Sequence, residues 1–155
     1  MGKAMFYHLT QRPLEATLPV LLERALAQNF RVVIRGTDAN RLDWLDQKLW
    51  LGPEEGFLPH GLAGSAHDAL QPVLLTMEAD GGGDRQCLMA VDGATVLPED
   101  VARHERSCIL FDGLDPKATD HARNQWRALS QVGAEAEYWS EDSGAWVCKH
   151  KTGGT

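Results

Sequence analysis

The amino-acid sequence predicts an α/β fold, a single domain in which a mostly parallel central sheet has helices on both faces and a C-terminal hairpin at one edge. Strand-like and helix-like segments alternate in the first half of the chain, a long amphipathic helix follows in the second half, and two strand-like runs close it. The chain has 155 residues, the length of one ordinary domain. We therefore expect residues 1–155 to fold as one unit, with 1–4 and 151–155 as flexible ends.

Short apolar or alternating runs, most of them bounded by glycine, proline or aspartate, predict the strands. They are residues 5–9, 30–35, 73–76, 86–91, 107–111, 134–140 and 145–149. The last two runs surround Ser143-Gly144, which favours a hairpin. Residues 54–71 have no clear period, so we expect a long loop there, and long loops in compact domains are often functional.

Two helices are expected in the first half of the chain. Leucine and alanine recur at helical spacing between 18 and 26. Thr17 is the expected N-cap of this helix, because Pro19 is best tolerated in the first helical turn. Thr37 or Asp38 is the expected N-cap of the second helix, whose leucines form its inner face.

The charge and cysteine content exclude several classes of protein. The chain carries 15 basic and 22 acidic residues, a formal charge of −7, so direct nucleic-acid binding would need a local basic patch. Apolar runs are far shorter than the roughly 20 residues of a membrane helix, and no signal-peptide pattern is present, so we expect a cytoplasmic protein without membrane contact. Cys87, Cys108 and Cys148 lie far apart in apolar or alternating runs, which is typical of buried thiols rather than of a disulfide framework or a zinc site.

Motifs for catalysis or cofactor binding are missing. The glycine patterns of phosphate loops and of dinucleotide-binding folds do not occur, and the glycines at 81–83 lie between aspartates. His60, His67 and Asp68 share the 54–71 loop, where ordinary polar loop residues are a more common explanation than a metal or catalytic site. We expect no cofactor, no metal and no catalytic residues; a small enzyme that uses the 60–68 loop stays open as an alternative.

A third helix, expected at 116–132, carries the most informative pattern. Asp115 is the expected N-cap, proline follows it at the first helical position, and Gly133 stops the helix. At about 100° per residue, one inward-facing stripe contains mostly small or apolar side chains. Its members are Ala118, Ala122, Gln125, Leu129 and Val132.

Beside this stripe, the helix presents one aromatic and two basic side chains. Relative to Ala122, Trp126 lies at about 40°, Arg123 at about 100° and Arg127 at about 140° around the helix axis. An aromatic wall next to two guanidinium groups can hold an acidic peptide that ends in a hydrophobic side chain. A solvated helix face with a tryptophan at its edge explains the same periodicity, so both interpretations stay open on this pattern alone.

Five runs of sequence resemble the chi subunit of bacterial DNA polymerase III holoenzyme. They are FYHL at 6–9, RLDWLDQKLW at 41–50, GFLPHGLAG at 56–64, FDG at 111–113 and ARNQWRAL at 122–129. The runs occur in the family's order, and the resemblance extends from about Met5 to Lys149. It implies an α/β fold with a mostly parallel sheet, and a replisome accessory subunit with no catalytic constellation of its own.

The resemblance also implies partners and a site. Chi proteins bind the acidic C-terminal tail of single-stranded DNA-binding protein, which ends in proline and phenylalanine, and many bind the psi subunit, which connects them to the clamp loader. The family's tail pocket uses a phenylalanine before a Pro-His pair, which falls on Phe57, and a basic, aromatic and basic trio, which falls on Arg123, Trp126 and Arg127. Relatives often have tyrosine and lysine at the last two positions, so this chain keeps the chemical types. Direct binding of single-stranded nucleic acid is the other alternative, and it would need a basic groove with several stacking aromatic side chains.

Overall fold

The computed structural model describes residues 2–10, 14–50, 60–62, 72–77, 85–142 and 145–152. The strands, in chain order, are β1 (Lys3–Leu9), β2 (Val32–Arg35), β3 (His60–Leu62), β4 (Val73–Thr76), β5 (Cys87–Ala90), β6 (Arg106–Asp112), β7 (Ala136–Asp142) and β8 (Ala145–Thr152). The helices are α1 (Leu14–Ala27), α2 (Ala39–Trp50), α3 (Pro98–Arg103) and α4 (Pro116–Gln131).

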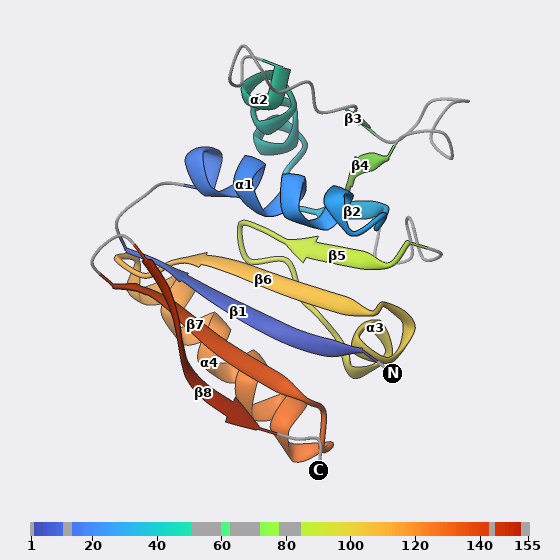
Figure 1. The fold of residues 1–155 in the computed structure, drawn as a ribbon. Coiled ribbons are helices and arrows are strands. Elements are labelled where there is room, and N and C mark those ends of the chain that lie inside the picture. The colour runs from blue at the N-terminus through green and yellow to red at the C-terminus, as the bar shows by residue number, and fades with distance from the viewer. Residues whose placement is uncertain are drawn as a thin grey trace.

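The described strands form one sheet with the order β3-β4-β2-β5-β6-β1-β7-β8 (Figure 1). Neighbouring strands run parallel up to β7, and β7 pairs with β8 in the antiparallel direction. The predicted fold class, a mostly parallel sheet with a C-terminal hairpin at its edge, is therefore confirmed.

The helices cover the two faces of the sheet, and each face has its own hydrophobic core. Leucines of α1 and α2 pack with Met5 and Tyr7 of β1 on one face. Side chains of α3 and α4 pack with Phe6 on the other face. Because successive side chains of a strand point to opposite faces, one short strand supplies both cores. Figure 1 shows α1 and α4 on opposite sides of the sheet.

The first helix begins earlier than its sequence predicts. It starts at Leu14, so Thr17 lies inside the helix and is buried, and Pro19 is an interior residue rather than part of the first turn. Pro19 leaves one carbonyl of the preceding turn without its usual helical partner. In return, the added turn places Leu14 against the core of that face. The free energy gained by burying apolar side chains explains why the helix begins before Pro19 rather than at it.

Other differences concern short elements and the chain ends. β3 lies within the expected 54–71 loop, and the six-residue helix α3 was not expected; both are too short to show a clear period. The remainder of that loop lies outside the described residues. Residues 3–4 and 151–152, which we expected in flexible ends, belong to β1 and β8, where backbone hydrogen bonds to neighbouring strands hold them. No helix in the described segments is long and apolar enough to span a membrane.

A buried ion pair connects β2 to α3. Arg35 Nη1 lies 2.9 Å from Asp100 Oδ2, and the two side chains are only 6% and 4% exposed. The Leu97 backbone N–H also donates to Asp100 Oδ2, at 2.9 Å. Burial by itself raises the pKa of Asp100, but the hydrogen bonds from Arg35 and Leu97 and the positive charge of Arg35 outweigh it and hold the pKa below its ordinary value.

Replacing this carboxylate is expected to destabilise the fold strongly. Asp100→Ala removes the carboxylate that neutralises the buried Arg35 guanidinium, and we expect the free energy of unfolding to fall by about 3 to 5 kcal/mol in urea denaturation. Glu99→Ala, at the exposed neighbouring position, is the control and should cost less than about 0.5 kcal/mol. Since the pKa of Asp100 is lower in the folded state, its contribution is present at neutral pH and is lost as the pH falls below the ordinary value of 3.8. Equal stability of the two variants at neutral pH would contradict this role.

Candidate functional site

Local signals position α4 as the sequence predicts. Asp115 is the N-cap, and its side chain accepts a hydrogen bond from the Lys117 backbone N–H at 3.0 Å. The helix is followed by Gly133, which has a φ of 75°. Gln125 is buried and accepts a hydrogen bond from the Val96 backbone N–H at 2.6 Å, which fixes the rotation of α4 against the sheet. That rotation decides which side chains α4 presents to solvent.

The inner stripe of α4 is shorter than predicted. Ala122, Gln125 and Leu129 are buried, and Ala118 is partly buried against the same core. Val132, the last expected member, is 61% exposed. The helix ends one residue before it, so the 100° step no longer describes where its side chain points.

The Trp126 indole lies between the core and the surface. It meets the buried Phe6 ring edge-on, with the ring centroids 5.2 Å apart, and it meets Tyr138 edge-on at 6.1 Å. These edge-to-face contacts are favourable in addition to the area they bury. The indole is half-buried, so part of it remains available to a ligand.

A hollow of about 480 Å³ opens beside this indole, and we call it the α4 hollow. It is lined by Phe111, Thr119, Ala122, Arg123, Trp126, Arg127, Tyr138, His150 and Lys151. These residues include the permanent cations Arg123 and Arg127 and no carboxylate. Lys151 pairs with Glu137 across the hairpin, so its charged side chain lies on the opposite face of the sheet. In a chain with a formal charge of −7, the α4 hollow is a local positive site next to aromatic rings.

The structure brings together three of the four expected site residues. Arg123, Trp126 and Arg127 line one hollow, and both arginine side chains are exposed. Phe57, the fourth, lies outside the described residues. The same is true of His67 and Asp68 of the alternative enzyme site, while His60 belongs to β3.

Sequence reasoning missed the side of the α4 hollow that the terminal hairpin supplies. Tyr138 comes from β7, and His150 and Lys151 come from β8. Tyr138 pairs with His150, but its neighbour Trp139 pairs with Cys148, so Lys149 is the extra residue of a β-bulge. The bulge changes the alternation of β8 and places His150 on the same face as Tyr138. Nothing in the local sequence marks this extra residue.

A hydrogen bond fixes the side chain of Tyr138, which forms one wall of the α4 hollow. The Tyr138 hydroxyl lies 2.6 Å from His8 Nδ1, and the His8 ring stacks on Phe111 with centroids 5.1 Å apart. Gly113 is needed beside this ring, because a Cβ at that position would overlap His8. Burial raises the pKa of Tyr138, and the nearby Arg123 charge lowers it in part. The phenol therefore stays protonated at neutral pH.

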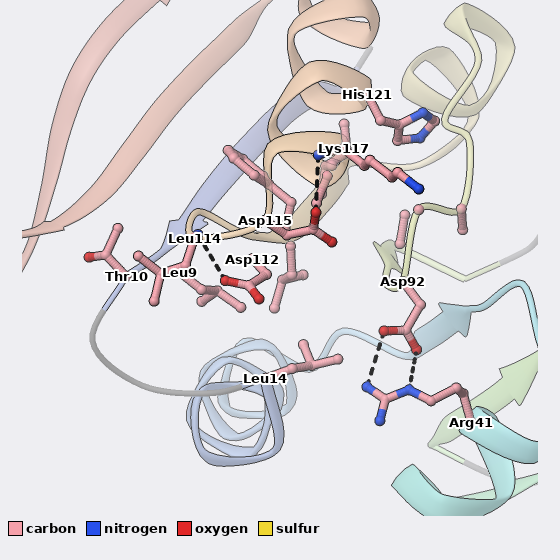
Figure 2. A pocket seen from close by; sticks show the side chains of 17 residues that line it. Leu9, Thr10, Leu14, Arg41, Asp92, Asp112, Leu114, Asp115, Lys117 and His121 are labelled. Carbon is pink, nitrogen blue, oxygen red and sulfur yellow. Dashed lines mark hydrogen bonds and ion pairs between the residues drawn. The ribbon is translucent and has the colours of Figure 1, made fainter.

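A second, larger hollow of about 740 Å³ lies at the carboxyl ends of β1, β5 and β6 (Figure 2). Figure 2 shows the Arg41 guanidinium facing the Asp92 carboxylate, with N–O distances of 3.1 Å. Asp112 accepts from the Leu114 backbone N–H, and Asp115 caps α4. Each carboxylate of this hollow thus has a structural partner. In the described part of the chain, no group of three or more His, Cys, Asp and Glu side chains could hold a metal ion.

The fold and the α4 hollow define an α/β protein that presents a basic and aromatic helix face beside a terminal hairpin. Residues 1–137 match the family model of the DNA polymerase III chi subunit, HolC. The chain belongs to this family of replication accessory proteins, and the resemblance seen in its sequence is confirmed.

One curated relative is "Probable DNA polymerase III subunit chi" of Rickettsia prowazekii (strain Madrid E). It is 26% identical over 103 residues, which are 66% of this chain and 59% of the relative. The chain thus spans less than two thirds of the length of that relative. The family match ends before Tyr138, so the hairpin residues of the α4 hollow lie beyond it.

The burial of both tyrosines predicts an alkaline titration that differs between the folded and unfolded chain. Burial raises the pKa of Tyr7 and of Tyr138 above the ordinary value of 10.0. At pH 10 the folded protein should therefore give less than about half of the tyrosinate absorbance at 295 nm that the chain gives in denaturant. Because the folded state holds these protons more tightly, protonation of the two phenols contributes to the free energy of unfolding. This contribution is complete below pH 10 and is lost as the pH rises further. Equal absorbance in the two states would contradict the burial, and Tyr138→Phe separates the two phenols.

Proposed function

We propose that this protein is a replisome adaptor that binds the acidic C-terminal tail of single-stranded DNA-binding protein in the α4 hollow. We also propose that it connects this tail to the clamp-loader assembly of DNA polymerase III, through a psi subunit where one is present. The observation that carries the proposal is the lining of the hollow, which combines the two arginines of α4 with aromatic rings and contains no carboxylate. Membership of the chi family supports the same function.

The terminal phenylalanine of the tail supplies the apolar part of binding. Its ring fits against Trp126 and Tyr138. Phe57, which the family pattern implies as a further ring, is not assigned to this hollow, because β3 begins three residues after it and lies at the opposite edge of the sheet from β7 and β8. Burying a side chain of this size contributes roughly 1.5 to 3 kcal/mol. An edge-to-face contact with an aromatic wall adds about 0.5 to 1.5 kcal/mol.

The cations supply the ionic part of binding. Arg127 or Arg123 takes the terminal carboxylate in a bidentate pair, and a hydrogen bond to a charged group contributes roughly 1.5 to 3 kcal/mol. The other arginine faces the aspartates of the tail. After the cost of ordering a flexible peptide, the affinity is expected near the micromolar range, about −8 kcal/mol. Such a contact exchanges readily, and several tails on one oligomer raise its occupancy.

Removing the aromatic or the basic side chain should weaken tail binding. We expect Trp126→Ala and Arg127→Ala each to reduce the affinity for a fluorescently labelled tail peptide at least tenfold, as measured by anisotropy, because each removes contacts worth about 1.4 kcal/mol or more. Lys117→Ala, which removes a positive charge from the same helix outside the α4 hollow, is the control. Circular dichroism checks that each variant keeps its fold. Unchanged affinity in both site variants would overturn the assignment of the site.

Tail binding should also depend on salt. Because part of the binding energy comes from exposed ion pairs, the affinity should fall steadily as ionic strength rises from about 0.05 to 0.3 M. Arg127→Ala should show a weaker dependence on salt than the unchanged protein, since one ionic contact is gone. An affinity that does not change with salt would mean that the cations take no part.

A pull-down separates this function from the two alternatives. Immobilised protein should retain intact single-stranded DNA-binding protein and should lose it when the last tail residues are deleted. Equal retention of both forms would exclude tail recognition. Retention of a single-stranded oligonucleotide without any protein partner would instead favour direct nucleic-acid binding.

A further inference from the structure

A third hollow, of about 360 Å³, lies on the face of the sheet opposite the α4 hollow, and we call it the α1 hollow. It is lined by Met5, Tyr7, Leu21, Arg24, Ala25, Ala27, Gln28, Cys87, Met89, Arg106, Cys108, Trp139 and Trp146. Arg24 comes from the last turn of α1 and Arg106 from the start of β6. As in the α4 hollow, the lining contains cations and aromatic rings but no carboxylate.

Sulfur-containing side chains form one part of the α1 hollow. Met5, Met89, Cys87 and Cys108 are all buried in the core beneath it. The Cys108 thiol is uncharged at neutral pH, because a hydrogen bond with Cys87 and burial raise its pKa well above the ordinary value. Thioethers and thiols make favourable contacts with aromatic rings, so the floor of the α1 hollow, where Met5 is the most exposed of the four at 7%, suits the edge of an aromatic side chain.

Aromatic side chains form the walls. Tyr7 and Trp146 meet edge-on with centroids 5.2 Å apart, and both Trp139 and Trp146 are only half-buried. The Trp139 indole N–H donates to Glu137 at 3.0 Å, which fixes the orientation of its ring. These indoles therefore resemble Trp126 of the α4 hollow: each has one part in the core and another beside an opening.

The two arginines carry the charge of the α1 hollow. Arg24 is exposed, and the Arg106 guanidinium lies over the Phe30 ring at 5.8 Å from its centroid. Within the described residues, neither arginine forms an ion pair with an acidic side chain. A net positive, partly apolar hollow on a protein of charge −7 is complementary to a ligand that combines carboxylates with an aromatic group.

We propose that the α1 hollow is a second peptide-binding site, separate from the α4 hollow, for an acidic protein segment that carries an aromatic side chain. The aromatic side chain lies against the sulfur-containing surface between the two indoles, and carboxylates on either side of it pair with Arg24 and Arg106. This site goes beyond the proposed function. It uses different side chains, on the other face of the sheet, and needs no free C-terminal carboxylate.

Methionine methyl groups provide a local test. The chain has four methionines, of which Met5 and Met89 line the α1 hollow, while Met77 is 50% exposed elsewhere. The probe is the blocked peptide acetyl-Asp-Glu-Phe-Glu-Asp-amide, added to full-length protein with ¹³C-methyl-labelled methionine. We expect saturable NMR shifts of the Met5 and Met89 methyl signals and none of Met77. The same peptide with serine in place of phenylalanine should shift neither.

Matched arginine variants complete the test. Arg24→Ala changes an exposed helical residue and should weaken the methyl response about tenfold, the loss of one charge-assisted contact. Arg123→Ala, the equivalent change in the α4 hollow, should leave it unaltered. Absence of the Met5 and Met89 shifts, or full affinity in Arg24→Ala, would overturn the proposal. A response to oligothymidylate but not to the peptide would overturn it in favour of nucleic acid.

The test also separates this site from the tail-binding site. The Trp126 indole N–H signal and its sensitivity to Arg123→Ala report on the α4 hollow, whereas the Met5 and Met89 methyl signals report on the α1 hollow. A Trp126 indole signal that stays silent with the tail peptide, together with methyl groups that shift with the blocked peptide, would reject the tail site and leave the α1 site standing. The reverse result would reject the α1 site alone.

Discussion

The strict alternation of side chains along β1 and β7 is the constraint on which both sides of this molecule depend. β1 is hydrogen-bonded to β6 on one side and to β7 on the other, so its register is fixed twice. Phe6 then has to point toward α4 and the Trp126 indole, and Tyr7 has to point toward α1 and Trp146. A slip of one residue in β1 would exchange these aromatic side chains between the faces, which removes the support of Phe6 from Trp126 and the Tyr7 wall from the α1 hollow.

Charge is distributed unevenly over this framework. The chain is acidic as a whole, yet neither the α4 hollow nor the α1 hollow has a carboxylate in its lining. The hollow at the carboxyl ends of the strands is different, because its aspartates are engaged by Arg41 and by backbone N–H groups. The α4 and α1 hollows are therefore locally positive and suit an acidic ligand. In the hollow at the carboxyl ends of the strands, the acidic side chains instead pair with Arg41 or with backbone N–H groups.

Elements with strong local signals could be predicted from the sequence, and those set by distant contacts could not. The cap at Asp115 and the helical period that groups Arg123, Trp126 and Arg127 are local, so α4 and its basic and aromatic face follow from the sequence. His150 reaches the same hollow only through strand pairing and a bulge, which no local pattern reports. The early start of α1 has the same cause, since the tertiary gain at Leu14 outweighs the cost of an interior proline.

The edges of the sheet bear on how this protein meets flexible chains. β3, at one edge, has three residues, and β8, at the other, carries the bulge at Lys149 and a further lysine at 151. Short length, irregular backbone and lysine side chains all discourage an extended segment from adding to a sheet as a new strand. Selectivity is then left to side-chain chemistry rather than to main-chain pairing, which would accept almost any sequence. The same edges discourage two copies of this chain from pairing edge to edge.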